Sequence, residues 1–266
     1  MTLVAPAPGS RPATIDIDHL TIDYVTEDTR LRAVEDLDFH IAAGEFVAVL
    51  GPSGCGKSTV LRVLAGLLRP TTGAARIAGE PVTGPRRDVG VVFQDPTLLP
   101  WKTVLENVLL PGRIMRLERA WCLERARQLL ALVGLESFWS YYPSQLSGGM
   151  RQRVGIARGL LHDPAVLLMD EPFGALDAMT RELMNLEIQR IWRDMRKTVL
   201  FITHSIPEAV FLADRIVVLS SRPGHLREVV ECHLPRPRTT VMMATPEFGA
   251  LTGRLRNLFG IESRID

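Results

Sequence analysis

The sequence predicts an α/β fold in which a mostly parallel sheet has helices on both of its faces. Continuous apolar runs carry this prediction, because a strand buried on both faces has few polar positions. The runs are Phe46–Leu50, Val89–Phe93, Ala165–Met169, Thr198–Thr203 and Ile216–Leu219. Segments with helical spacing separate them, as the crossover connections between parallel strands require.

Length and composition fit this class. The 266 residues suit one large domain with a small inserted or appended subdomain. Lys and Arg total 31 against 30 for Asp and Glu, so no broad basic field indicates a nucleic-acid partner. The 3 cysteines are widely spaced and odd in number, which favours a reducing cytoplasm over a disulfide framework. No stretch of about 18 apolar residues lacks a charge, so we expect no transmembrane helix.

The N-terminal part should consist of a tail followed by antiparallel strands. Residues 1–14 are rich in Pro and Ala and lack the basic start and apolar core of a signal peptide, so we expect a disordered tail. From Ile15 to Phe39 apolar residues alternate imperfectly with polar ones, which is typical of half-buried strands. A polar turn is expected near Glu27 to Thr29.

A helical insertion and a helical tail complete the predicted organisation. Between residues 95 and 163 strand-like runs vanish, and Leu117 to Val133 shows helical spacing. We expect an inserted helical subdomain there, within a main domain spanning 15–240. Residues 241–266 should form a C-terminal helical tail, whose helix begins at Thr245-Pro246-Glu247.

A glycine-rich loop follows the first apolar run. Residues 51–58 match the G-x-x-x-x-G-K-[ST] phosphate-loop pattern, between a strand and an apolar-periodic segment. Glycines let backbone N–H groups turn toward one anion, and the following helix adds its positive N-terminus. A chance match in a chain of this length is expected on the order of once in a hundred. Candidate nucleotide-binding residues are Gly51, Ser53, Gly54, Cys55, Gly56, Lys57, Ser58 and Thr59.

Two side chains of this loop have specific expected roles. Lys57 should reach the β- and γ-phosphates of ATP, and Ser58 should place its hydroxyl on Mg²⁺. Cys55 is interpreted as a small filler rather than a redox group, although the nearby helix N-terminus favours a lowered pKa. Alkylation of Cys55 is expected to block ATP binding sterically.

The run that begins at Ala165 ends in two acids, Asp170 and Glu171. The carboxyl edge of an open α/β sheet is where nucleotide sites form. Asp170 can hold Mg²⁺ as a Walker B aspartate does, whereas Glu171, expected on the other side of the pleat, can orient or deprotonate the attacking water. The alternative is a pair of solvated charges that merely end the strand.

Two further polar residues follow. Asp177 precedes a long helical segment and is expected to cap that helix, whatever other role it has. His204 ends the apolar run that begins at Thr198. None of the 6 histidines has metal-ligand spacing, so His204 is either structural or a hydrogen-bond donor to the γ-phosphate.

One segment connects these features to a family. Residues 146–153, Leu-Ser-Gly-Gly-Met-Arg-Gln-Arg, closely resemble the LSGGQ signature of the ATP-binding cassette superfamily, with Met150 in place of Gln. Ser147, Gly148 and Gly149 would open a helix whose N-terminus binds an anion. The alternative is an ordinary Ser-Gly-Gly loop before a helix. The motifs follow one another in the family order over roughly Ile15 to Gly224.

The resemblance implies a P-loop NTPase core with an antiparallel β-subdomain and an inserted helical subdomain. It implies ATP and Mg²⁺ as cofactors, a Q-loop at Gln94 that senses the metal, a D-loop at Asp177 and a switch histidine at His204. Catalytic roles would fall to Glu171, His204 and Gln94, and metal-binding roles to Ser58, Gln94 and Asp170. Tyr24 resembles the aromatic residue that stacks on adenine, or else it fills the core. Two cassettes, expected to be identical, would pair head to tail around ATP.

Among cassette proteins, a transporter subunit is favoured. Soluble cassettes that act on DNA or ribosomes usually carry tandem cassettes, coiled-coil insertions or zinc-binding cysteines, and this sequence has none of these. An inactive scaffold is disfavoured because every catalytic position is filled. The partners implied are integral-membrane permease subunits and, indirectly, a solute-binding protein, which would place the chain peripherally at the cytoplasmic face of the plasma membrane.

Three segments resemble the bacterial importers of nitrate, sulfonate, taurine and bicarbonate. They are Leu98–Val108, Glu208–Arg215 and Ser221–Gly224. Trp101 belongs either to the groove for a permease coupling helix or to the core of the helical subdomain. A sulfonate, nitrate or taurine-like anion is the expected solute, and a thiamine-precursor pyrimidine is the alternative.

Overall fold

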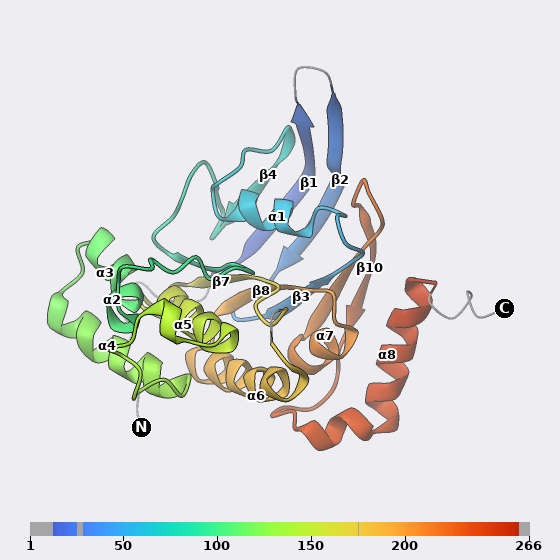
Figure 1. The fold of residues 1–266 in the computed structure, drawn as a ribbon. Helices are drawn as coiled ribbons and strands as arrows, with labels where there is room; N and C mark the ends of the chain where they lie inside the picture. The colour runs from blue at the N-terminus through green and yellow to red at the C-terminus, as the bar shows by residue number, and fades with distance from the viewer. Residues whose placement is uncertain (1–12, 26–28, 175, 261–266) are drawn as a thin grey trace.

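The computed structural model describes residues 13–25, 29–174 and 176–260. They form two sheets with helices between and around them (Figure 1). Residues 1–12 of the predicted tail, the expected turn at 27–28 and the last residues of the C-terminal tail, 261–266, lie outside the described residues.

The central sheet has 6 strands in the order β10-β9-β3-β8-β7-β6. All neighbours pair in parallel except β10, which pairs antiparallel with β9. The predicted mostly parallel sheet is confirmed. Its strands are β3 (Phe46–Leu50), β6 (Val89–Val92), β7 (Val166–Asp170), β8 (Thr198–Thr203), β9 (Arg215–Leu219) and β10 (Leu226–Glu231).

The continuous apolar run of β3 is explained by a separate core on each face of the sheet. Val47 and Val49 point into the core beneath the second sheet. Phe46, Ala48 and Leu50 point into the larger core, which is covered by helices α4 to α8. Because successive strand residues face opposite sides, a strand between two cores must be apolar throughout.

The second sheet is antiparallel, in the order β2-β1-β4-β5. Its strands are β1 (Ile15–Val25), β2 (Arg30–Ile41), β4 (Thr72–Ile77) and β5 (Glu80–Pro81). Helix α1 (Lys57–Leu64) contacts both sheets and lies between them (Figure 1). The helix that follows the phosphate loop is therefore enclosed by packing on two sides.

Helices occupy the segment between β6 and β7, where the described residues contain no strand. They are α2 (Val104–Val108), α3 (Leu110–Ile114), α4 (Arg119–Leu132), the 3₁₀ turn η1 (Pro143–Gln145) and α5 (Gly148–Leu160). Helices α6 (Ala178–Met195) and α7 (Ile206–Leu212) then connect β7, β8 and β9. No described helix is both long and apolar enough to cross a membrane.

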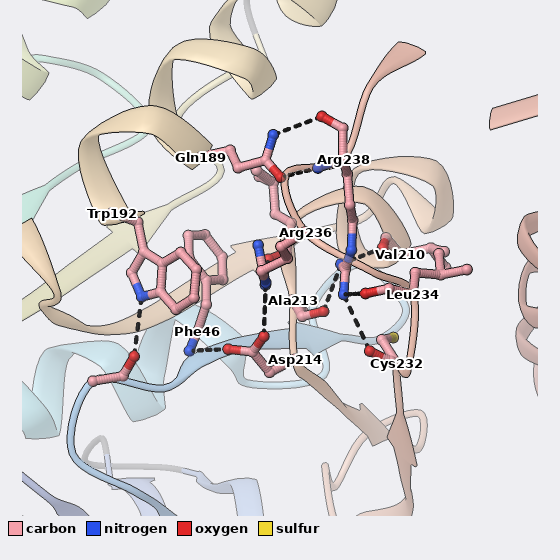
Figure 2. A network of polar contacts seen from close by, with 12 residues as sticks. Phe46, Gln189, Trp192, Val210, Ala213, Asp214, Cys232, Leu234, Arg236 and Arg238 are labelled. Carbon is pink, nitrogen blue, oxygen red and sulfur yellow. Dashed lines mark hydrogen bonds and ion pairs between the residues drawn. The ribbon is translucent and has the colours of Figure 1, made fainter. Parts of the chain in front are cut away.

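The C-terminal part packs against α7 through two arginines (Figure 2). Arg238 is 1 % exposed, and its guanidinium donates to carbonyl oxygens of Val210, Ala213, Cys232 and Leu234. The Gln189 side chain of α6 bonds to the backbone N–H and C=O of Arg238 at 2.6 and 2.7 Å. The bonds to Val210 and Ala213 satisfy carbonyls at the end of α7 that have no partner within the helix.

Arg236 makes a second anchor. It forms an ion pair of 2.7 Å with Asp214, donates to the Leu212 carbonyl and stacks 4.2 Å above the Trp192 ring. Asp214 in turn accepts from the backbone N–H of Phe46, the first residue of β3 (Figure 2). Beyond this anchor lie the 3₁₀ turn η2 (Thr240–Ala244) and α8 (Pro246–Leu258), which Thr245 caps, as predicted.

Candidate nucleotide site

Four polar segments meet at the carboxyl edge of the central sheet. The phosphate loop follows β3, His204 follows β8, Asp170 ends β7 with Glu171 directly after it, and Gln94 follows β6. These strands are neighbours in the order β3-β8-β7-β6. The register pairs Leu50 with Thr203 across β3 and β8, so the segments begin at the same level of the sheet. The strand order therefore gathers residues that are up to 153 positions apart, from Gly51 to His204.

The phosphate loop has glycines where its backbone demands them. Gly56, directly before α1, has a φ of 99°, in the region that side chains rarely adopt. A Cβ atom there would lie 2.6 Å from the Val34 side chain, so only glycine fits against β2. Lys57 is buried, and its Nζ donates to the carbonyl oxygens of Gly51 and Pro52 at 2.7 and 2.9 Å. The lysine ammonium thus lies inside the curve of the loop.

Ser58 and Asp170 form the candidate metal-binding pair. The Ser58 Oγ donates to Asp170 Oδ1 at 2.9 Å, which joins the start of α1 to the end of β7. Burial raises the pKa of Asp170, and the neighbouring Glu171 charge adds to this, whereas the Ser58 hydrogen bond opposes it. A divalent cation would reverse this effect by stabilising the carboxylate.

Glu171 and His204 lie side by side. Nδ1 of His204 is 2.9 Å from Oε2 of Glu171, close enough for a hydrogen bond. The expectation that Glu171 takes the next position of the pleat was wrong, because β7 ends at Asp170 and Glu171 has a φ of 43°. The chain leaves the sheet at this residue, and the left-handed turn aims its carboxylate toward β8.

A pocket of about 350 Å³ brings most of the predicted site residues together. It is lined by Tyr24, Leu31, Ala33, Ser53, Gly54, Gly56, Lys57, Ser58, Thr59, Gln94, Glu171 and Arg222. The Tyr24 hydroxyl lies 3.2 Å from Thr59 Oγ1, and its ring packs partly against the adjacent core. Tyr24 thus borders the pocket and also contacts the core, and its stacking on adenine stays a prediction.

Ser147, Gly148, Gly149 and Asp177 do not line this pocket. Ser147 caps α5 by accepting from the Met150 N–H, and Asp177 caps α6 by accepting from the Thr180 N–H at 3.0 Å. The two caps are near one another, since a Cβ atom on Gly149 would lie 3.7 Å from the Thr180 side chain. Within one copy of the chain, the signature segment therefore lies outside the pocket that contains the phosphate loop.

Cys55 differs from one expectation. Its side chain is 1 % exposed, and burial raises the pKa of its thiol despite the nearby Lys57 and Arg222 charges. The backbone N–H of Lys57 at the helix N-terminus does lower this pKa, as expected, but burial outweighs it. The filler interpretation fits the position, because a Cβ atom on Gly51 would lie 2.8 Å from the sulfur.

The comparisons with known proteins agree with this geometry. A family model described as ABC transporter matches residues 34–174. The chain belongs to the ABC transporter family. It is 47 % identical over 84 % of its length to an uncharacterized ABC transporter ATP-binding protein of Methanocaldococcus jannaschii, covering 84 % of that protein. It is 43 % identical over 85 % of its length to an aliphatic sulfonates import ATP-binding protein of Bacillus cereus, covering 89 % of it.

Solved ABC cassettes have the same fold. A structure described as a dimeric bacterial ABC transporter cassette matches with a TM-score of 0.75 and 34 % identity, over 83 % of this chain and all of that one. A second match at 32 % identity and the same TM-score is described as a post-hydrolysis state bound to ADP and Pi. The P-loop NTPase fold, the resemblance to sulfonate-importer cassettes and the ATPase class predicted from the motifs are confirmed.

Sequence reasoning assigned no role to some residues around this ABC site. Leu31, Ala33 and Arg222 line the pocket, yet none belongs to the motifs that were assigned to the nucleotide. The sequence did contain a signal for Arg222, because this residue belongs to Ser221–Gly224, one of the segments that resemble the importer group. Trp101 is 69 % exposed, which excludes the interpretation that it fills the core of the helical segment.

Proposed function

We propose that this chain is the ATP-hydrolysing subunit of an importer, and that it drives uptake of a small solute through a separate permease. The observation that carries the proposal is the meeting of the phosphate loop, Asp170, Glu171 and His204 at one edge of the sheet. Similarity to proteins named for sulfonate import supports the importer assignment. Phosphate release by the purified chain, abolished by Lys57→Met, tests the ATPase part.

Each site residue has a role in the proposed hydrolysis. Lys57 and the backbone of the phosphate loop bind the β- and γ-phosphates. Glu171 orients the attacking water and accepts its proton. His204, held beside Glu171 at 2.9 Å, donates to the γ-phosphate and fixes the position of the carboxylate. Gln94 lines the same pocket, where its amide can detect whether the γ-phosphate is present.

The donor set suits Mg²⁺. Oxygen ligands are what this ion prefers in proteins, and it commonly takes one or two of them from the protein besides phosphate and water. The Ser58 hydroxyl lies 2.9 Å from the Asp170 carboxylate, and Ser58 and Gln94 both line the pocket. Bound there, the ion would neutralise charge that develops on the phosphate oxygens.

Head-to-tail pairing of two copies would complete the site. The capped N-terminus of α5 at Ser147 lies outside the pocket that contains the phosphate loop, so a second chain is needed to bring both to one γ-phosphate. A helix N-terminus offers free N–H groups and positive charge to an anion. Sedimentation with and without MgATP tests this arrangement: ATP should produce a dimer, and Ser147→Arg should prevent it.

Exposed apolar residues of the helical segment favour attachment to a permease. Trp101 and Ile114 are 69 % and 70 % exposed. A pocket of about 460 Å³, away from the phosphate loop, is lined by residues of α2 to α4 and of the turns between them, such as Leu105, Leu109 and Cys122. A pull-down of tagged protein from native membranes in mild detergent should recover a multi-span permease. Recovery of only ribosomal or nucleic-acid partners would refute the transport assignment and leave the ATPase intact.

The proposed solute is an aliphatic sulfonate or a related small anion, such as nitrate or taurine. The support is the identity of 41–43 % to several aliphatic sulfonates import proteins over 85 % of the chain. Uptake of labelled sulfonate, taurine, nitrate and a thiamine-precursor pyrimidine should be compared in cells that carry or lack the gene. Loss of pyrimidine uptake alone would select the alternative solute. The proposed location is the cytoplasmic face of the plasma membrane.

A further inference from the structure

The connection between β9 and β10 is packed against the phosphate loop. Within it, Gly224 donates from its N–H to the Ala33 carbonyl and accepts from the Glu35 N–H, both at 3.0 Å. A Cβ atom on Gly224 would lie 2.0 Å from the carbonyl oxygen of Cys55, so the backbone there touches the phosphate loop directly. The segment Ser221–Gly224 thus fills the space between β2 and the loop.

Arg222 of this segment extends along the phosphate loop. Its Nε donates to the Gly54 carbonyl at 3.0 Å, and Nη2 is 3.2 Å from where a Cβ atom on Gly54 would be. The same side chain lines the nucleotide pocket together with Tyr24 and Leu31. The Nε bond uses only one of the five N–H donors of a guanidinium, which leaves the terminal nitrogens for another acceptor.

The part of the chain that the structure describes provides no carboxylate partner for the charge of Arg222. Among residues 13–25, 29–174 and 176–260, no carboxylate forms an ion pair with this guanidinium, whose hydrogen-bond partner there is the Gly54 carbonyl. An unpaired guanidinium beside a loop built for phosphates is suited to bind a polyphosphate, because its fork of donors matches phosphate oxygens.

We propose that Arg222 is a further nucleotide-binding residue, which holds the phosphate loop through Nε and binds phosphate oxygens of ADP and ATP through its terminal nitrogens. This inference rests on the proposed nucleotide site and adds the connection between β9 and β10 to the segments that bind the nucleotide. It assigns a role to Ser221–Gly224, a segment that no motif of the phosphate loop, the acids or the signature includes.

The alternative is that Arg222 only braces the Gly54 carbonyl. The two roles differ in their dependence on charge. If Arg222 only supports the loop through its Nε hydrogen bond, Lys and Gln both lose that bond, so both substitutions should lower nucleotide affinity equally. A phosphate ligand needs positive charge, so Lys should largely replace Arg, and the affinity should depend on ionic strength.

The test is equilibrium binding of ADP and MgATP to the whole chain at several salt concentrations. Arg222→Gln should weaken both affinities by roughly 3- to 10-fold, as expected for loss of one solvent-accessible charged hydrogen bond. Arg222→Lys should retain most of the affinity, and the slope of log Kd against log salt should be shallower for the Gln variant. Arg227→Gln, on the same hairpin and exposed but outside the pocket, is the matched control.

Steady-state kinetics gives a second measurement. In Arg222→Gln the KM for MgATP should rise while kcat stays within about twofold, because Glu171 and His204 are untouched. Unchanged affinity in Arg222→Gln, or equal losses in the Gln and Lys variants with an unchanged salt slope, would overturn the inference and leave the ATPase assignment standing. Failure of the unmodified chain to bind either nucleotide would instead overturn the proposed function, and this inference with it.

Discussion

Arg181 on α6 and Glu208 on α7 form an ion pair at 3.4 Å that links the two loops beside the catalytic residues. Arg181 also donates to the Leu176 carbonyl, next to the capping Asp177. Glu208 accepts from the Thr203 hydroxyl at 2.6 Å, and that hydroxyl accepts from the Ser205 N–H. His204 therefore sits between two residues that Glu208 holds in place.

We predict that Glu208→Ala lowers kcat roughly tenfold with little change in KM, because a displaced His204 turn costs catalytic geometry rather than nucleotide affinity. Phosphate release in a double-mutant cycle with Arg181→Met measures the coupling. The double variant should lose little beyond Glu208→Ala alone, since that substitution already breaks the ion pair with Arg181. Arg190→Met, exposed on the same helix, is the control. Fully additive losses would show that the ion pair does not position the histidine.

Glu171→Gln should bind ATP normally and lower kcat at least about 100-fold, because the amide orients water but accepts no proton. ATP should then accumulate in a closed dimer that sedimentation detects. Glu182→Gln, an exposed carboxylate on α6, is the control and should be unaffected. Hydrolysis at the unmodified rate would remove Glu171 from the catalytic role.

His204 and Glu171 should act as one unit. We expect His204→Ala to lower kcat by roughly 10- to 100-fold. The substitution removes a hydrogen-bond donor from the transition state. It also removes the ring nitrogen that lies 2.9 Å from the Glu171 carboxylate and holds it in place. In the Glu171→Gln background the same substitution should cost much less. Single-turnover rates of the four variants measure this. Independent, multiplicative losses would contradict a shared step.

Asp170→Asn should stabilise the apo protein while it abolishes Mg²⁺-dependent hydrolysis. Burial raises the pKa of Asp170, so its ionisation lowers the free energy of unfolding as pH rises from the ordinary carboxyl range through the folded-state pKa. Asn removes that buried charge and keeps an oxygen for the Ser58 hydroxyl. Urea unfolding should show a gain at pH 8 that shrinks toward pH 4. A gain of equal size at both pH values would exclude the charge as its cause.

Arg238→Met should destabilise the fold by about 2–4 kcal/mol, because it leaves several buried carbonyls without donors. Burial lowers the pKa of this arginine to about 10, so the guanidinium remains protonated at neutral pH. Urea unfolding measures the loss. The exposed Arg87→Met should change little. A variant as stable as the parent would mean that water replaces the arginine at the end of α7.

Much of the nucleotide site was predictable because its signals are local. Each signal lies within about eight residues of sequence. These signals are the apolar run of β3, the glycines of the loop and the two acids at the carboxyl end of β7. The caps at Ser147, Asp177 and Thr245 bond to N–H groups three positions on. The turn at Glu171 was not predicted, because its φ of 43° depends on how the chain leaves the sheet and not on the residue type.

The sequence by itself determined which chemistry the chain carries, since a strand, a phosphate loop and a helix cap follow from residues that are neighbours along the chain. Only the tertiary structure decided which segments lie together. Arg222 meets Gly54 across 168 positions, and Arg181 meets Glu208 from a different helix. Such pairs depend on strand order and on which apolar faces pack against each other. These are properties of the whole core, so no short stretch of sequence encodes them.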